Sequence, residues 1–140
     1  MGAMNRTPIT VQVLVNAPIE KVWTSWNEPQ HIVGWAFASD DWEARAPEND
    51  LRTGGSFKTT MAAKDNSASF DFTGTYTNVK VNERIEYVMD DGRTVRVEFR
   101  ETPTGVEITE TFDPESENAE EVQRSGWQAI LNNFKKYVEG

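Results

Sequence analysis

Glu110 is the residue whose type and position best suit acid–base chemistry. It lies between Ile108 and Phe112 in a segment where apolar and polar residues alternate, so it is predicted to share their inward face. A buried carboxylate needs a partner or a raised pKa. Two structural explanations stay open: an ion pair to an arginine such as Arg52 or Arg96, or a shift of register that turns the side chain outward. Glu110 is therefore a weak candidate for a pocket acid that orients a ligand or moves a proton.

Other residue types that carry chemistry are scarce or badly spaced. Without cysteine there is no thiol nucleophile, disulfide or cysteine zinc site, and the single histidine, His31, cannot build a His-rich metal centre. His31 has no serine or acid at a telling spacing, so we expect a surface or capping residue near the mouth of a cavity. The glycine pair at 54–55 lacks the frame of a phosphate-binding loop, and the acidic pairs at 40–41 and 90–91 lack Ca²⁺-loop spacing. We expect no metal and no cofactor.

The composition excludes several classes of partner. The chain has 140 residues, 23 acidic against 14 basic, and a formal net charge of -9. Nucleic-acid binding needs concentrated lysine and arginine, so that class is disfavoured. The sequence contains no apolar run long enough for a membrane span and no signal-peptide pattern, so a cytoplasmic protein is expected. Five Trp, seven Phe and three Tyr are many for this length, and they indicate either a bulky core or an aromatic cavity.

The elements that must position these residues follow from hydrophobic periodicity. Residues 9–15 alternate as a strand, and residues 19–26 carry one apolar helical face after Pro18. A second short helix is predicted over 30–33, with Gly34 as its C-terminal cap. Glu107 is expected on the solvent face, opposite Glu98 or Arg100. The later segments that alternate between turn signals make five to seven strands in all, and they cover 41–46, 56–63, 67–81, 85–89, 94–100 and 106–112.

A long helix is predicted to end the chain, from about 119 to 138. Asn118 and Glu121 resemble a capping box at its start. Its apolar residues span an arc of roughly 200°, whereas a surface helix needs little more than ~100°. The helix is therefore expected to lie inside a concave sheet, with Gly126 allowing a backbone or a ligand to come close. The residues of that arc are Val122, Gly126, Trp127, Ala129, Ile130, Leu131, Phe134, Tyr137 and Val138.

A set of short motifs in this order resembles the START-like or Bet v 1-like (SRPBCC) helix-grip superfamily. The closer resemblance is to the branch of the activator-of-Hsp90-ATPase homologues and polyketide-cyclase-like proteins. It implies an α+β fold in which a curved antiparallel sheet wraps around the long C-terminal helix, with two short helices after the first strand. Residues 9–139 would form this single domain and 1–8 a tail, in part a cloning remnant. The motifs are residues 16–23, Trp35, 52–57, 72–76, 84–87, 110–112 and 126–134.

The inward faces of the sheet and the last helix nominate a cavity wall, supported by the cavities common among the similar proteins. The alternative is that these side chains simply pack against one another. In a cavity, Trp35 and Trp127 would stack on a ligand, and Glu110 or Tyr87 would supply polarity. The expected ligand-binding residues are Trp35, Phe57, Met61, Phe72, Tyr76, Tyr87, Met89, Trp127, Ile130 and Phe134.

Three functions stay open at this stage. The preferred one is binding of a small hydrophobic or aromatic ligand between the sheet and the C-terminal helix. The first alternative is a cyclase- or hydrolase-like enzyme that uses a cavity carboxylate, although the lack of catalytic motifs favours a protein without enzymatic activity. The second is a co-chaperone-like interaction module, which is disfavoured because the larger N-terminal domain of the Hsp90 activator has no counterpart here. Sheet edges and the tryptophan surplus are compatible with a homodimer.

Overall fold

A seven-stranded antiparallel sheet and three helices make up the described part of the chain. The computed structural model describes residues 7–140, so the predicted tail at 1–8 lies outside it except for the two residues before the first strand. The strand order is β1-β7-β6-β5-β4-β3-β2. The elements are β1 (Ile9–Val15), α1 (Ile19–Asn27), α2 (Pro29–Ile32), β2 (Trp42–Asn49), β3 (Ser56–Ala63), β4 (Ser69–Lys80), β5 (Arg84–Met89), β6 (Thr94–Thr102), β7 (Gly105–Phe112) and α3 (Glu120–Glu139).

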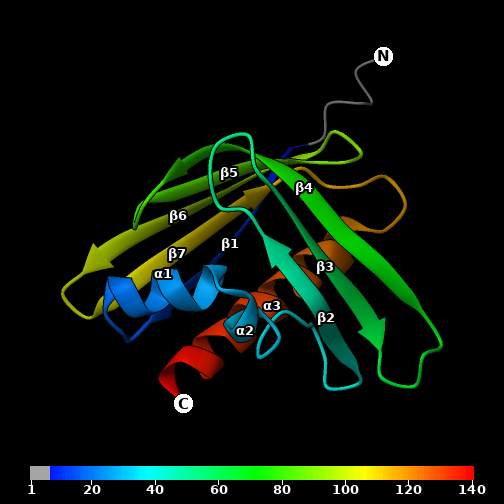
Figure 1. Cartoon of the computed structure of the whole chain (residues 1–140), viewed down its shortest axis with the longest axis horizontal. Helices are drawn as coiled ribbons and strands as arrows, with labels where there is room; N and C mark the ends of the chain where they lie inside the picture. Colours follow the sequence, from blue (N-terminus) through cyan, green and yellow to red (C-terminus); the bar gives the residue numbers. More distant parts are fainter. Residues whose placement is uncertain (1–6) are drawn as a thin grey trace.

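The sheet curls around α3, and α1 and α2 lie across one end of the space that it encloses (Figure 1). Every neighbouring pair of strands is antiparallel, as short turns between strands require. The predicted α+β helix-grip fold is confirmed. None of the helices within residues 7–140 combines the length and apolarity needed to cross a membrane.

Strand register brings the inward side chains into rows across the sheet. β7 alternates strictly between buried and partly exposed residues, and Glu110 falls on its buried face. Because the side-chain period of a strand is two, a slip by one residue would expose the whole row, and the buried face therefore fixes the register. One row holds Val11, Glu110, Val97, Ile85 and Val79; the next holds Ile9, Phe112, Val95, Tyr87 and Tyr76.

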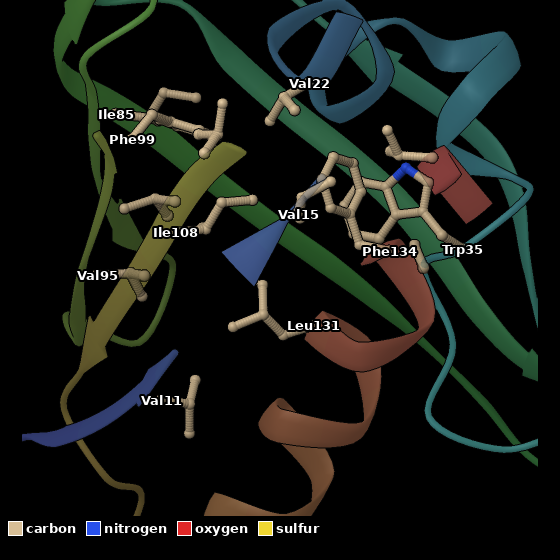
Figure 2. Close-up of a cluster of buried hydrophobic side chains, with 14 of the residues drawn as sticks. Val11, Val15, Val22, Trp35, Ile85, Val95, Phe99, Ile108, Leu131 and Phe134 are labelled. Carbon is tan, nitrogen blue, oxygen red and sulfur yellow. The ribbon is translucent and has the colours of Figure 1, made fainter. Parts of the chain in front are cut away.

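The apolar core joins α3 to the β1 side of the sheet. Leu131 and Phe134 of α3 are fully buried among side chains of the sheet and of α1 (Figure 2). Trp35, from the segment after α2, packs edge-to-face on Phe134 with ring centroids 4.9 Å apart. Its indole Nε1 donates to the Ser25 carbonyl at 2.9 Å, so this large side chain is buried without an unsatisfied donor.

Polar side chains of α3 also fasten the helix to the outer edge of β1. An edge strand carries backbone carbonyls with no neighbouring strand to bond them. Three such carbonyls of β1 accept hydrogen bonds from side chains along one side of α3. These side chains supply the donors that a neighbouring strand would otherwise supply. The pairs are Arg124 Nη1 to Thr10 O at 3.0 Å, Gln128 Nε2 to Gln12 O at 3.0 Å and Lys135 Nζ to Leu14 O at 2.6 Å.

The start of α3 differs from the predicted capping box. Ala119 is the N-cap and its side chain makes no capping hydrogen bond. The buried amide of Gln123 instead donates to the carbonyls of Glu115 and Asn118, at 3.1 and 2.9 Å, and its oxygen accepts from the Glu115 N–H. The loop before the helix is thus held by a residue inside the first turns, because its carbonyls, and not only the helix N–H groups, need partners.

The apolar arc of α3 is narrower than predicted at its N-terminal part. Val122 is 61% exposed, and a Cβ added to Gly126 would meet no atom within 4 Å. The sheet therefore does not enclose the first turns of the helix, and Gly126 does not mark a close approach.

Strand β2 is longer than the predicted strand at 41–46. It continues through Pro47 to Asn49, because a register shift between Arg45 and Glu48 accommodates the proline.

Gly34 is required for packing rather than for capping. Its φ angle is not in the left-handed region, so the predicted glycine cap is wrong. A Cβ at this position would lie 2.3 Å from the ring of Tyr137, whose hydroxyl forms a 2.7 Å hydrogen bond with His31 Nδ1. The absence of a side chain at Gly34 lets α3 come close to α2, and the hydrogen bond between His31 and Tyr137 joins the two helices.

The Gly34→Ala variant should lose about 1–3 kcal/mol of unfolding free energy, because overpacking displaces the Tyr137 ring. The matched control is Gly126→Ala, which adds the same methyl group to open space in a helix and should gain about 0.5–1 kcal/mol. Urea unfolding followed by circular dichroism measures both. Equal effects of the two substitutions would contradict the packing role of Gly34.

Candidate functional site

A cavity of about 310 Å³ lies between the inner face of β3–β5 and α3. It lies where the curled sheet turns away from α3, because α3 packs mainly against β1 and α1, and α2 packs against β2 at the far edge of the sheet. Ligand sites of drug-like molecules begin at about 300 Å³ and are mostly apolar. The residues that line it are Trp26, Asn27, Ile32, Trp35, Ala36, Glu48, Asn49, Phe57, Thr59, Met61, Phe70, Phe72, Tyr76, Ile85, Tyr87, Met89, Arg93, Glu110, Trp127 and Ile130.

Nine of the ten residues nominated from the sequence lie around this cavity. The exception is Phe134, which is fully buried and is not part of the wall. The rings of Trp26 and Trp35 each pack on Phe134 at 4.9 Å and separate it from the open space. The helical arc could not distinguish a wall residue from one beneath the wall, because both face inward. That the nine residues bind a ligand stays a prediction.

Aromatic rings interlock along the sheet side of the cavity. Phe57 lies at the centre of this group, with ring centroids 4.8 Å from Tyr87 and 5.3 Å from both Phe72 and Tyr76. Gly74 makes room for it, since a Cβ there would lie 2.7 Å from the Phe57 ring. Edge-to-face and tilted pairs of this kind restrain one another. The wall is therefore shaped before any ligand enters.

The two tryptophans expected to stack on a ligand differ in what they offer. Trp127 is stacked on Phe112, with centroids 4.0 Å apart and planes at 9°, so one of its faces is already covered. Trp35 is 6% exposed and tilts against Trp26 at 4.9 Å. Trp127 is thus covered on one face by Phe112 and also meets Phe72 edge-to-face, with ring centroids 6.3 Å apart, while Trp35 contributes a small part of the cavity lining.

One polar group of the cavity comes from β2 and the end of α1, and its hydrogen bonds are made within the protein. The Tyr76 hydroxyl donates to Asn49 Oδ1 at 2.5 Å, and Asn49 Nδ2 donates to the Asn27 carbonyl at 2.7 Å. Asn27 Nδ2 in turn donates to the Trp23 carbonyl at 2.9 Å. Burial raises the pKa of Tyr76 above its usual value, so it stays a neutral donor. This chain fixes β2 to α1.

The second polar group comes from β5 and β7, and its members have no such partners. Glu110 is 7% exposed and forms no hydrogen bond or ion pair with any group in residues 7–140. The hydroxyl of Tyr87 also forms no hydrogen bond within that part of the chain. Since no polar side-chain atom there is both sealed and unpaired, their oxygen atoms open into the cavity. Two buried ionisable side chains therefore line the cavity, together with the buried hydroxyl of Thr59, which also forms no hydrogen bond in that part of the chain.

Burial changes the ionisation of both groups. It raises the pKa of Glu110 from 4.5 to about 8, because a carboxylate loses its hydration there. Burial also raises the pKa of Tyr87 well above its usual value, and a charge on Glu110 would raise it further. At neutral pH both side chains are uncharged and can donate a hydrogen bond. An acid with a pKa near neutrality can also give and take a proton.

The structure resolves the alternatives left open for Glu110. Its place on the buried face of β7 excludes the outward register, and the two suggested arginines have other partners: Arg52 pairs with Asp50 at 2.9 Å and Arg96 with Glu98 at 3.9 Å. Glu107, three residues earlier, pairs with Arg100 at 2.8 Å on the other face, as predicted.

The remaining polar candidates have structural roles. His31 is half-buried, lies outside the cavity lining and forms a hydrogen bond with Tyr137, so it has a packing role between α2 and α3. In the acidic pairs, Asp41 accepts from Ser39 at 2.6 Å and Asp91 pairs with Arg93 at 2.8 Å. No group of acidic or histidine side chains in residues 7–140 is arranged to hold a metal ion.

Several lining residues escaped prediction. Asn49 lies beyond the strand predicted over 41–46, because Pro47 does not suit a strand, and Asn27 follows the helical face predicted over 19–26. Trp26 belongs to the apolar helical face predicted over 19–26, but that pattern does not show that its side chain reaches a cavity. Arg93 follows a turn, where a charged residue gives no sign that it reaches a cavity. The two tryptophans on one face of α1, Trp23 and Trp26, are the signal that the sequence offers.

The stability of the protein should depend on pH through Glu110. Between about pH 5 and 8 the folded protein keeps a proton on Glu110 that the unfolded chain releases. The free energy of unfolding of the wild type should therefore fall, relative to Glu110→Gln, by about 1.4 kcal/mol per pH unit, and the difference should level off above pH 8.

Urea unfolding at pH values from 5 to 9 measures this difference. The matched control is Glu101→Gln, at an exposed position near the end of β6, whose effect should not vary across the range. A constant difference between the wild type and Glu110→Gln would show that Glu110 is ionised in the folded protein.

Comparisons with known proteins agree with this architecture. The family described as activator of Hsp90 ATPase homolog 1-like protein matches residues 16–139. Among solved structures, the AHSA1-like protein from Aeromonas hydrophila is 47% identical, with a TM-score of 0.90 over 95% of this chain and 92% of that one. Chr148 from Cytophaga hutchinsonii is 57% identical, with a TM-score of 0.82 over 94% and 92%. Protein CV1439 from Chromobacterium violaceum shares the fold at 22% identity, with a TM-score of 0.85 over 96% and 99%.

No curated protein matches the chain. The family match covers most of the chain, and two solved structures that cover nearly all of it are similar in sequence as well as in fold. The chain therefore belongs to the family of activator of Hsp90 ATPase homolog 1-like proteins.

Proposed function

We propose that this protein binds a small hydrophobic or aromatic ligand in the cavity between the sheet and α3. The observation that carries this proposal is a cavity of about 310 Å³ walled by aromatic side chains, into which the unpaired groups of Glu110 and Tyr87 open. A wall of apolar rings with a few directed polar groups is the usual form of a small-molecule site. If the aromatic surplus served only to fill a core, those rings would close the space.

Naphthalene is a suitable first probe because a rigid two-ring hydrocarbon is apolar and small enough for a cavity of about 310 Å³ lined by aromatic rings. A ligand that binds only the folded protein raises its stability by RT ln(1 + [L]/Kd), which is about 2.7 kcal/mol at a hundred times Kd. The Thr59→Phe variant should weaken naphthalene binding at least tenfold, because the added ring occupies the cavity that Thr59 lines. Thermal unfolding with increasing naphthalene measures both effects.

The matched control is Thr75→Phe on the neighbouring strand, where the side chain is exposed and lies outside the cavity lining. It should bind naphthalene like the wild type. Equal binding by the two variants would place the ligand elsewhere, and no stabilisation of the wild type by any apolar probe would remove the proposal. Near-ultraviolet circular dichroism checks that each variant keeps its packed core.

A second candidate function is acid–base catalysis in the same cavity, as expected of a cyclase-like enzyme. The observation that favours it is the position of Glu110: a carboxyl group with a pKa raised to about 8, on the same sheet face as the Tyr87 hydroxyl. Such a pair can polarise a ligand carbonyl and exchange a proton at the adjacent carbon, which is the first step of an aldol ring closure.

Deuterium exchange tests this candidate directly. The protein would be incubated with 2-acetylnaphthalene in D₂O, and loss of the acetyl proton signal would be followed by NMR. Catalysis predicts exchange faster than in buffer, lost in Glu110→Gln because an amide cannot transfer the proton. If exchange matches the buffer rate while the ketone is bound, the protein is a binder and not an enzyme for this reaction.

A further inference from the structure

Two adjacent rows of the sheet each place one uncharged donor in the cavity. Glu110 lies in the row of Val97 and Ile85, and Tyr87 in the next row, so both side chains leave the same face of the sheet. Both are buried, both open into the cavity and neither has a hydrogen-bond partner within residues 7–140. Of the other polar side chains that line the cavity, Tyr76 is bonded to Asn49 and Arg93 is paired with Asp91. The buried hydroxyl of Thr59 is a third donor without a hydrogen bond in residues 7–140, and Glu48 is exposed.

We propose that the cavity selects aromatic ketones, with the ligand's carbonyl oxygen accepting hydrogen bonds from the Glu110 carboxyl and the Tyr87 hydroxyl while its rings lie among Phe57, Phe72 and Trp127. This inference rests on the proposed function and narrows it to one class of ligand. A carbonyl oxygen has two lone pairs, so it can accept from both donors at once.

A hydrocarbon ligand satisfies the site less well. It would cover the two donors without replacing the hydrogen bonds that they make with water, and an unpaired buried donor is costly. Sites built to bond a polar group reject analogues that lack it much more strongly than apolar pockets reject a misfit. The two donors therefore supply selectivity that the aromatic wall alone cannot give.

An amine ligand also fits less well. It would need the ionised form of Glu110, which the apolar surroundings disfavour. Arg93 lines the same cavity, so a positive charge is already present near Tyr87; burial still holds the pKa of Tyr87 well above its usual value, and Arg93 offsets only part of that rise. The charged and titratable groups that line the cavity are Glu48 of β2, Tyr76 of β4, Tyr87 of β5, Arg93 of the β5–β6 turn and Glu110 of β7.

Three probes of matched shape test the proposal: 2-acetylnaphthalene, its hydrocarbon isostere 2-isopropenylnaphthalene, and 1-(2-naphthyl)ethylamine. Dissociation constants are measured by calorimetry with the full chain at pH 6.5. We expect the ketone to bind at least tenfold more tightly than the hydrocarbon and than the amine. At pH 9.5 the ketone preference should shrink at least fivefold, because ionised Glu110 repels the carbonyl oxygen.

Two substitutions separate the donors from the shape of the cavity. Glu110→Gln keeps a neutral donor, so it should keep the ketone preference and lose its pH dependence. Tyr87→Phe removes one donor, and it should reduce the preference at least threefold with little effect on hydrocarbon binding. Since Glu110→Gln and the pH series of the wild type report on the same group, the test does not depend on one variant folding.

Equal affinities for ketone and hydrocarbon in the wild type would overturn the inference and leave the proposed function standing. Tighter binding of the amine, increasing with pH, would overturn it in favour of an ionised Glu110. Loss of the ketone preference in Glu110→Gln would also contradict it, because that variant retains a donor. Failure of all three probes to bind would contradict the proposed function together with the inference.

Discussion

The attachment of α3 to the edge of β1 determines where the cavity of this protein lies. Apolar residues such as Leu131 pack on the β1 side, and polar side chains on the neighbouring face of the helix bond the free carbonyls of that strand. A helix fastened along one edge of a curled sheet cannot also lie against the far arm. The space under β3–β5 is therefore left to side chains alone, and large interlocked rings can line it without filling it.

The same sheet register that builds the core imposes a carboxyl group on the cavity. Glu110 alternates with Ile108 and Phe112, which are both fully buried, so it cannot turn outward without exposing them. Its neighbours across the strands are Val11 and Val97, and an aliphatic residue would suit that place better on packing grounds. The protein tolerates the glutamate by keeping it protonated, at a cost in stability near neutral pH. A residue kept at such a cost points to use by a ligand.

Most of the architecture could be predicted from the sequence because period-two alternation identifies the inward face of each strand. That alternation was enough to place Phe57, Tyr87 and Glu110 on the wall. It could not show whether an arginine reached Glu110, since side-chain partners depend on distances between strands. The two predictions of helix caps were wrong for a similar reason. Gln123 bonds the loop before α3, and Gly34 makes room for the ring of Tyr137. Both roles depend on contacts between segments, which a local sequence pattern does not contain. Phe134 and Ile130 lie on the same inward arc of α3 and differ in depth, which periodicity does not measure.

The bonds from α3 to β1 also bear on how the protein could be engineered for solubility. Arg124, Gln128 and Lys135 look like ordinary solvent-facing residues that a supercharging design would exchange for acids. Each of them instead covers a backbone acceptor that a foreign strand would otherwise use. Replacing them with glutamate would add negative charge and would also leave the backbone carbonyls of the β1 edge free to pair with another strand. The exposed edge of β1 is thus covered by three particular cationic or amide side chains, in a chain whose overall charge is strongly negative.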